Sequence, residues 1–194
     1  MSDTHGAILL VRHGKPALSR AIRLSAREYR RWWDDLYESG GLTPGEVATE
    51  EVRDFAAGAC AILTTPRRRA IESAALVREG YEAEVDPDLI EAHLPTPPAP
   101  DFIKVGPKTW GFVSRFLWWY FGYGDGGETR LQAEVRADRV ADKLVRLSQA
   151  GDVMVVAHGF FNIMIGRALR KQGWRQIGRE HFSHWNARRF EFKR

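Results

Sequence analysis

Three short apolar runs constrain the fold of this 194-residue chain more than any other feature. They are residues 7–12 (AILLVR), 60–64 (CAILT) and 152–157 (DVMVVA), and amphipathic stretches separate them. Runs that are apolar at nearly every position are typical of strands buried on both faces of a mostly parallel sheet. Strands that alternate with helices in this way predict an α/β fold with helices layered on the sheet.

The remaining elements are indicated by local signals. Residues 185–192 (WNARRFEF) alternate in polarity and predict a terminal edge strand. Capping boxes at residues 25–28, 43–46 and 129–132 predict three helix starts. Thr65-Pro66 predicts a fourth start, with Gly80 placed to end that helix. Residues 160–171 form an amphipathic helical pattern directly after a glycine.

Residues 95–127 depart from this alternation, because they begin with PTPPAP and continue into WGFVSRFLWWYFGYGDGG. We expect one domain over residues 1–194, with residues 95–127 as an aromatic-rich insertion between core elements. The glycines of residues 122–127 predict a flexible hinge. Four uses fit the aromatic side chains: a lid, a hydrophobic substrate pocket, a homodimer contact or a membrane-surface patch. Packing of the insertion onto the core accounts for them equally well.

Composition narrows the expected partners and location. The net charge of +4 favours anionic ligands, but scattered arginines without a binding motif argue against nucleic acid. No run approaches the roughly 20 apolar residues of a membrane span, and no secretory signal is seen. The single cysteine, Cys60, lies in an apolar run and cannot form an internal disulfide. We therefore expect a buried thiol and a cytoplasmic protein.

Two of the predicted strands end in a histidine followed by glycine. Arg12-His13-Gly14 closes the first, and His158-Gly159 closes the one near the C-terminus. Ligands of open α/β sheets bind outside the carboxyl ends of the strands. A glycine lets the backbone approach a ligand closely, and the helix after Gly159 would present free N–H groups to an anion.

Three successive arginines follow Thr65-Pro66 at a predicted helix start. Cations there oppose the helix dipole, whereas a bound phosphoryl group would match their guanidinium groups. We expect Arg69 to face such a ligand, and Arg67 and Arg68 to face solvent.

In order and spacing, these residues resemble the histidine phosphatase (phosphoglycerate mutase-like) superfamily from about residue 8 to 169. The similar segments are Arg12-His13-Gly14, Thr65-Pro66 with Arg69-Ala70 and Ser73-Ala74, Glu91 after Leu89-Ile90, Gly127-Glu128-Thr129, and His158-Gly159. The resemblance implies a three-layer α/β/α sandwich with a mostly parallel sheet. It also implies a phosphoric monoester hydrolase that uses no metal and no cofactor.

The resemblance further implies a role for each site residue. His13 would attack phosphorus and become phosphorylated. Substrate binding would fall to Arg12, Arg69, a protonated His158 and the backbone at Gly14 and Gly159. Glu91 would protonate the leaving oxygen and then deprotonate water. Asp88 is the alternative to Glu91, because both lie in an acidic stretch.

Two departures from the family pattern bear on the substrate. Residues 15–19 (KPALS) stand where the family often has Glu-Thr-x-x-Asn, so Ser19 or Lys15 would substitute as a phosphate contact. Residues 92–95 (AHLP) do not match the mutase branch, which favours hydrolysis of a small phosphomonoester. The alternatives are a phosphoglycerate-type mutase and a phosphate-binding module without efficient catalysis. The spacing His181-x-x-His184 also occurs in metal sites, but solvated or packing histidines explain it better.

Overall fold

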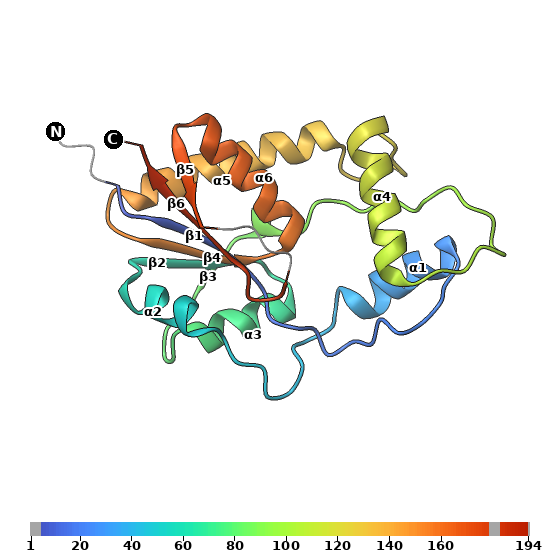
Figure 1. The fold of residues 1–194 in the computed structure, drawn as a ribbon, viewed down its shortest axis with the longest axis horizontal. Helices are drawn as coiled ribbons and strands as arrows, with labels where there is room; N and C mark the ends of the chain where they lie inside the picture. The colour runs from blue at the N-terminus through green and yellow to red at the C-terminus, as the bar shows by residue number, and fades with distance from the viewer. Residues whose placement is uncertain (1–4, 179–182, 194) are drawn as a thin grey trace. The chain divides into compact units, whose positions relative to one another are not determined.

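The computed structural model describes residues 5–178 and 183–193 (Figure 1). The chain divides into two compact units. The first consists of Met1–Pro16, Gly41–Glu91 and Glu134–Arg194, and the second of Ala17–Gly40 and Ala92–Ala133. The expected insertion at residues 95–127 lies within the second unit, together with an earlier segment that the sequence did not set apart.

A six-stranded sheet of order β3-β2-β4-β1-β6-β5 organises the first unit. Its strands are β1 (Ile8–Arg12), β2 (Ala61–Thr64), β3 (Glu84–Val85), β4 (Val153–Ala157), β5 (Trp174–Ile177) and β6 (Ala187–Phe192). The pairs β1–β4, β2–β4 and β2–β3 are parallel, and β6 runs antiparallel to β1 and β5. The three apolar runs form the central strands, which confirms the predicted mostly parallel sheet.

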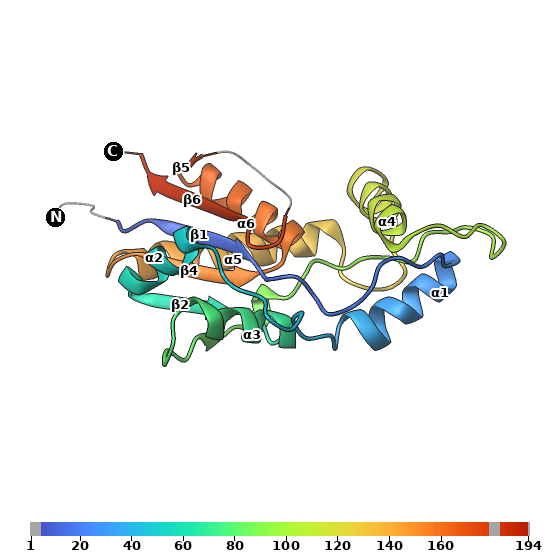
Figure 2. The ribbon, with the colours of Figure 1, turned by 60° about the horizontal axis from the view of Figure 1, so that its bottom comes forward.

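Helices cover both faces of this sheet (Figure 2). On one face lie α2 (Glu50–Gly58) and α3 (Arg68–Val77), and on the other α5 (Arg130–Ser148) and α6 (Gly159–Lys171). The alternation of side chains along β1 supplies both faces. Leu9 and Val11 join the core against α2 and α3, where they meet Val52 and Ala74. The predicted three-layer sandwich is confirmed.

Capping boxes predicted two of the three helix starts correctly. Ser25 caps α1 (Ala26–Arg31) with both bonds of the box present, and Thr129 forms the same pair of bonds with Gln132 before α5. The start predicted at residues 43–46 is wrong, since α2 begins at Glu50. The Glu46 carboxylate instead accepts the Lys15 N–H. The Thr43 hydroxyl donates to the Pro16 carbonyl, so neither side chain caps a helix.

Two other expectations are wrong. Residues 185–192 do not form an edge strand, because β6 lies between β1 and β5 and the sequence did not reveal β5. The Trp174 side chain of β5 is only 1% exposed, so packing of this strand depends on tertiary contacts. Cys60 is exposed rather than buried, and it lies immediately before the first residue of β2.

The second unit has its own aromatic core. It contains α1, a π-helix over Trp32–Tyr37 and α4 (Pro107–Phe121), which the sequence did not predict as a helix. Buried members of the core include Tyr29, Trp32 and Trp110. The expected hinge begins as a helix cap, because Gly122 ends α4 in the left-handed conformation with φ of 62°. Among the described residues, no helix combines the length and the apolar character that a membrane span needs.

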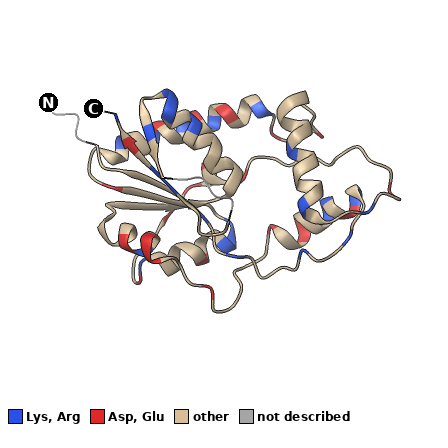
Figure 3. Ribbon diagram, in the orientation of Figure 1, with Lys and Arg blue, Asp and Glu red and all other residues tan. Residues whose placement is uncertain are grey.

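The acidic stretch before Glu91 is paired with α5, along which acidic and basic residues alternate (Figure 3). Lys143 Nζ lies 2.7 Å from carboxylate oxygens of both Glu84 and Asp86. Arg139 binds both carboxylate oxygens of Asp88, at 2.9 and 3.2 Å. These ion pairs, together with the 3₁₀ helix Pro87–Leu89, fix the course of the chain that leads to Glu91.

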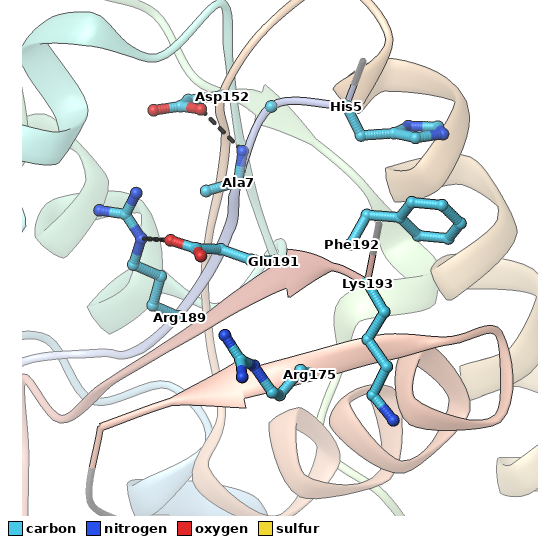
Figure 4. Close-up of a pocket in the computed structure, with 9 residues that line it drawn as sticks. His5, Ala7, Asp152, Arg175, Arg189, Glu191, Phe192 and Lys193 are labelled. Carbon is cyan, nitrogen blue, oxygen red and sulfur yellow. Dashed lines mark hydrogen bonds and ion pairs between the residues drawn. The ribbon is translucent and has the colours of Figure 1, made fainter. Parts of the chain in front are cut away.

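At the start of β1 the chain lies tightly against the turn before β4, beside a cavity of about 610 Å³ (Figure 4). Ala7 N–H donates to the Asp152 carboxylate at 2.7 Å, and Gly6 N–H donates to the Ser148 carbonyl at 2.7 Å. A Cβ on Gly6 would lie 2.2 Å from the Gly151 carbonyl carbon. The two backbones can approach this closely only because residue 6 has no side chain.

We predict that Gly6→Ala lowers the free energy of unfolding by about 1–3 kcal/mol, because the added methyl group forces two backbones apart. Urea denaturation measures the loss. Gly58→Ala is the matched control, since a Cβ at Gly58 meets nothing within 4 Å. Equal stability of the two variants would contradict the close packing described for Gly6.

Candidate active site

His13 follows β1 at its carboxyl end and is only 2% exposed. Its Nδ1 lies 2.7 Å from the Gly14 carbonyl oxygen, which can only accept, so Nδ1 carries the proton. The other ring nitrogen, Nε2, accepts from Arg69 Nε at 3.3 Å. The lone pair of Nε2 therefore faces a guanidinium group, as a nucleophile towards an anionic phosphoryl group requires.

Ser73 ties the His13 loop to α3. Gly14 N–H donates to Ser73 Oγ at 2.9 Å, and Ser73 Oγ donates to the Arg69 carbonyl at 2.6 Å. The hydroxyl is completely buried. It thus sets the spacing between the His13 loop and Arg69. Ser73 belongs to the motif recognised in the sequence, but this bridging contact was not expected.

The arginines of the site differ in their surroundings. Arg69 is 1% exposed. The Arg12 side chain lies over Gly159, where a Cβ would be 3.2 Å from Arg12 Cδ. Arg68 is exposed as predicted and pairs with Glu72 at 2.6 Å. The solvent-facing position predicted for Arg67 is wrong, because its side chain is half-buried and its charge acts on His158.

His158 lies beside His13, since β1 and β4 are paired in parallel and end together. The ring centroids are 5.3 Å apart and the planes stand at 72°. His158 is 1% exposed, and within the described part of the chain its Nε2 has no hydrogen-bond partner. A buried polar atom without a partner costs free energy, so a ligand for this nitrogen is indicated.

The pKa values of both histidines lie well below the ordinary value of 6.5. For His13 the largest cause is burial, followed by the charge of Arg69. For His158 burial again comes first, followed by the charge of His13. With protein groups alone around it, the pKa of His158 therefore favours the neutral form. The protonated His158 expected from the sequence would need the negative charge of a phosphoryl group beside it.

The side chain of Glu91 lies against the first turn of α6, the helix that follows His158. Its carboxylate accepts from the N–H groups of Phe160 and Phe161, at 3.3 and 2.8 Å. The prediction that the start of this helix offers free donors is thus wrong for these two groups. The structure thus brings Glu91 to the carboxyl end of β4. It directs the carboxylate of Asp88 to Arg139 on α5 instead.

Arg136 is a further residue of the site region, which the sequence did not single out. Its Nη1 donates to the carbonyls of Asp88 and Ile90, at 2.6 and 2.9 Å. Its guanidinium lies 3.8 Å from the centroid of the Phe161 ring. Arg136 thus supports the segment that ends in Glu91. The sequence could not single out Arg136, because it is one of several arginines on α5 and belongs to no motif.

The remaining candidates from the sequence are Ser19, Lys15 and the histidines of the His181-x-x-His184 spacing. Ser19 belongs to the second unit, where its hydroxyl accepts from Ala21 N–H at 3.2 Å. Lys15 is exposed, in the first unit. His184 has its ring centroid 5.8 Å from that of His13, whereas His181 lies outside the described residues. Within residues 5–178 and 183–193, no group of three or more His, Cys, Asp or Glu residues is arranged to hold a metal ion.

The lowered pKa values of His13 and His158 predict how stability depends on pH. Below about pH 6.5 the unfolded chain binds protons that the folded chain does not, so stability falls as pH drops. Each histidine contributes up to about 1.4 kcal/mol per pH unit. Urea denaturation from about pH 7.5 down to pH 5.5 measures this slope. The double variant His13→Gln/His158→Gln should have a flatter slope, and a slope equal to that of the wild type would refute the assignment.

Comparisons with known proteins identify the family of this chain. The sequence profile of the histidine phosphatase superfamily (branch 1) matches residues 8–194. A protein from an open reading frame of Mycobacterium tuberculosis has a similar structure, with a TM-score of 0.65 and 19% identity over 98% of this chain and 93% of that one. A search of curated proteins found no match.

Two further solved structures are similar in fold. A phosphoserine phosphatase mutant from Entamoeba histolytica has a TM-score of 0.59 and 15% identity, over 97% of this chain and 91% of that one. A mycobacterial glucosyl-3-phosphoglycerate phosphatase has a TM-score of 0.55 and 20% identity, over 86% and 82%. Together with the profile match over nearly the whole chain, the fold and the gathered residues show that this protein belongs to the histidine phosphatase superfamily.

Proposed function

We propose that this protein hydrolyses a small phosphomonoester through a phosphohistidine at His13. The observation that carries the proposal is the arrangement of the His13 ring. Its Nδ1 proton is bound to the Gly14 carbonyl, and its Nε2 lone pair faces Arg69. Burial and neighbouring cations lower the pKa of His13, so the ring is neutral and nucleophilic near neutral pH.

In the first half-reaction, His13 Nε2 donates its lone pair to phosphorus and the bond from phosphorus to the leaving oxygen breaks. Glu91 supplies the proton that the leaving oxygen takes up. Arg12, Arg69 and His158 bind the equatorial oxygens, where negative charge is spread during transfer. The alcohol leaves, and the phosphoryl group stays on His13.

In the second half-reaction, water attacks the phosphoryl group and the bond between phosphorus and Nε2 breaks. Glu91 accepts the proton from water, which restores its starting state. The lone pair returns to His13, and inorganic phosphate is released. Two of the similar solved structures are named as phosphatases, which supports hydrolysis over phosphoryl return to the substrate.

We predict that the wild-type protein hydrolyses p-nitrophenyl phosphate in the presence of EDTA and that His13→Ala abolishes this activity. The reason is that His13 supplies the attacking nitrogen. Samples incubated with ³²P-labelled substrate and quenched in alkaline detergent should show a phosphoprotein that is stable to alkali and labile to acid, in the wild type alone. His5→Ala is the matched control, because His5 bonds to Ser148 at the start of β1. If His13→Ala hydrolysed p-nitrophenyl phosphate as fast as the wild type, the proposed mechanism would be wrong.

A second prediction separates Glu91 from Asp88. Glu91→Gln should slow hydrolysis of an alkyl phosphate such as phosphoserine by about 10²–10⁴-fold, because an alkoxide is a poor leaving group without a proton donor. With p-nitrophenyl phosphate the loss should be much smaller, since nitrophenolate leaves without protonation. Asp88→Asn should affect neither substrate. Parallel steady-state assays of both variants decide the point, and the reverse pattern would assign the role to Asp88.

A further inference from the structure

The backbone of Trp185 and Asn186, just before β6, is irregular where it pairs with Arg12 at the carboxyl end of β1. Arg12 N–H donates to the Asn186 carbonyl at 3.0 Å, and the Arg12 carbonyl accepts from Trp185 N–H at 3.1 Å. Two residues thus oppose one, which is the hydrogen-bond pattern of a β-bulge. The first of them, Trp185, has φ of 58°, in the left-handed region. Glycine usually occupies this place, so the tryptophan is held in a strained conformation.

Contacts on two sides hold Trp185 there. Its side chain is 7% exposed and belongs to the core between the sheet and helices α2 and α3. Its ring atoms Cζ2 and Cε2 lie 2.9 and 3.0 Å from the position that a Cβ of Gly14 would take. The indole therefore rests on the residue whose carbonyl binds the His13 proton. Strained residues persist where their surroundings fix them, and they cluster at functional sites.

The same segment places His184 beside the nucleophile. The rings of His184 and His13 have centroids 5.8 Å apart and planes inclined at 38°. His158 is the other imidazole neighbour, at 5.3 Å. The His13 ring is thus packed against two imidazoles, while its Nδ1 is bound to the Gly14 carbonyl. A ring surrounded in this way has little freedom to rotate.

We propose that Trp185 and His184 form a positioning pair for His13. Trp185 fixes Gly14, whose carbonyl keeps the proton on Nδ1, and His184 restricts the ring. Together they preserve Nε2 as the unprotonated, attacking nitrogen through successive turnovers. The pairing rests on the proposed function, because it serves the phosphohistidine step. Neither residue belongs to the motifs that identify the family in this sequence.

Charge adds a second effect of His184. The titratable and charged groups around His13 are Arg12, Arg69, His158 and His184, and Glu46 lies against Gly14. Burial and then Arg69 lower the pKa of His13 most, and His184 acts in the same direction. Removing the His184 imidazole should therefore raise the pKa of His13. The acidic limb of the phosphorylation rate would then move to higher pH.

The test compares four variants of the full chain with the wild type: Trp185→Gly, His184→Ala, His184→Phe and Trp174→Phe. Trp185→Gly suits the left-handed backbone but removes the indole. Trp174→Phe is the control for loss of a buried indole, because Trp174 is 1% exposed and lies in β5. ¹⁵N NMR reports the tautomer of His13. Single-turnover assays with p-nitrophenyl phosphate, from about pH 5 to 8, report phosphohistidine formation.

We expect the wild type and Trp174→Phe to show one tautomer, with the proton on Nδ1. Trp185→Gly should show a mixture and form phosphohistidine about ten- to a hundredfold more slowly, while the substrate concentration that half-saturates the single-turnover rate changes less than about twofold. His184→Ala should be slow and have a shifted acidic limb. His184→Phe should recover the rate, because the ring contact returns, but keep the shifted limb.

Two results would overturn the positioning pair. The first is that folded Trp185→Gly and His184→Ala show the same His13 tautomer, the same rate of phosphohistidine formation and the same acidic limb as the wild type. The other is an equal loss of rate in Trp174→Phe, which would reduce Trp185 to a general packing residue. Absence of phosphohistidine in the wild type would instead refute the proposed function. The NMR measurement would still decide whether Trp185 and His184 fix the His13 ring.

Discussion

The parallel pairing of β1 with β4 is the constraint on which the site depends. Arg12 is in register with Ala157, so the residues that follow each strand leave the sheet at the same edge. His13 N–H donates to the Ala157 carbonyl at 2.9 Å, which extends the ladder one residue beyond the strand. The two histidine rings are neighbours for this reason. The groups from α3 and α6 then approach the same point because their helices begin at this edge.

Absence of side-chain atoms at two glycines lets these groups come together. The Trp185 indole packs where a side chain of residue 14 would lie, and the Arg12 side chain packs where one of residue 159 would lie. The glycine of each His-Gly pair therefore makes room for a packed side chain. The same close packing buries the two histidines and lowers the pKa of each, so burial favours neutral imidazole rings beside fixed cations.

The similarity of fold extends further than the similarity of sequence. Solved structures that share 15–19% identity with this chain cover more than nine tenths of it. Such a relationship fixes the architecture and leaves specificity open, because one fold hosts many substrates. In the aromatic second unit, Phe112, Phe116 and Tyr120 are exposed at four-residue spacing along α4.

The sequence by itself determined the sheet core and the layers, because apolar runs are local signals. Its strand-end and helix-start motifs predicted His13, Arg69 and His158 as site residues, and the structure brings these three side chains together. The sequence failed where a side chain's partner lies far along the chain. Glu46 forms a capping pattern but binds Lys15 instead, and β5 is a strand only because β6 pairs with it. Only the tertiary structure decided that Glu91 lies at the start of α6 and that His184 lies beside His13. Both placements bring together residues well over fifty positions apart, and no local pattern records such a distance.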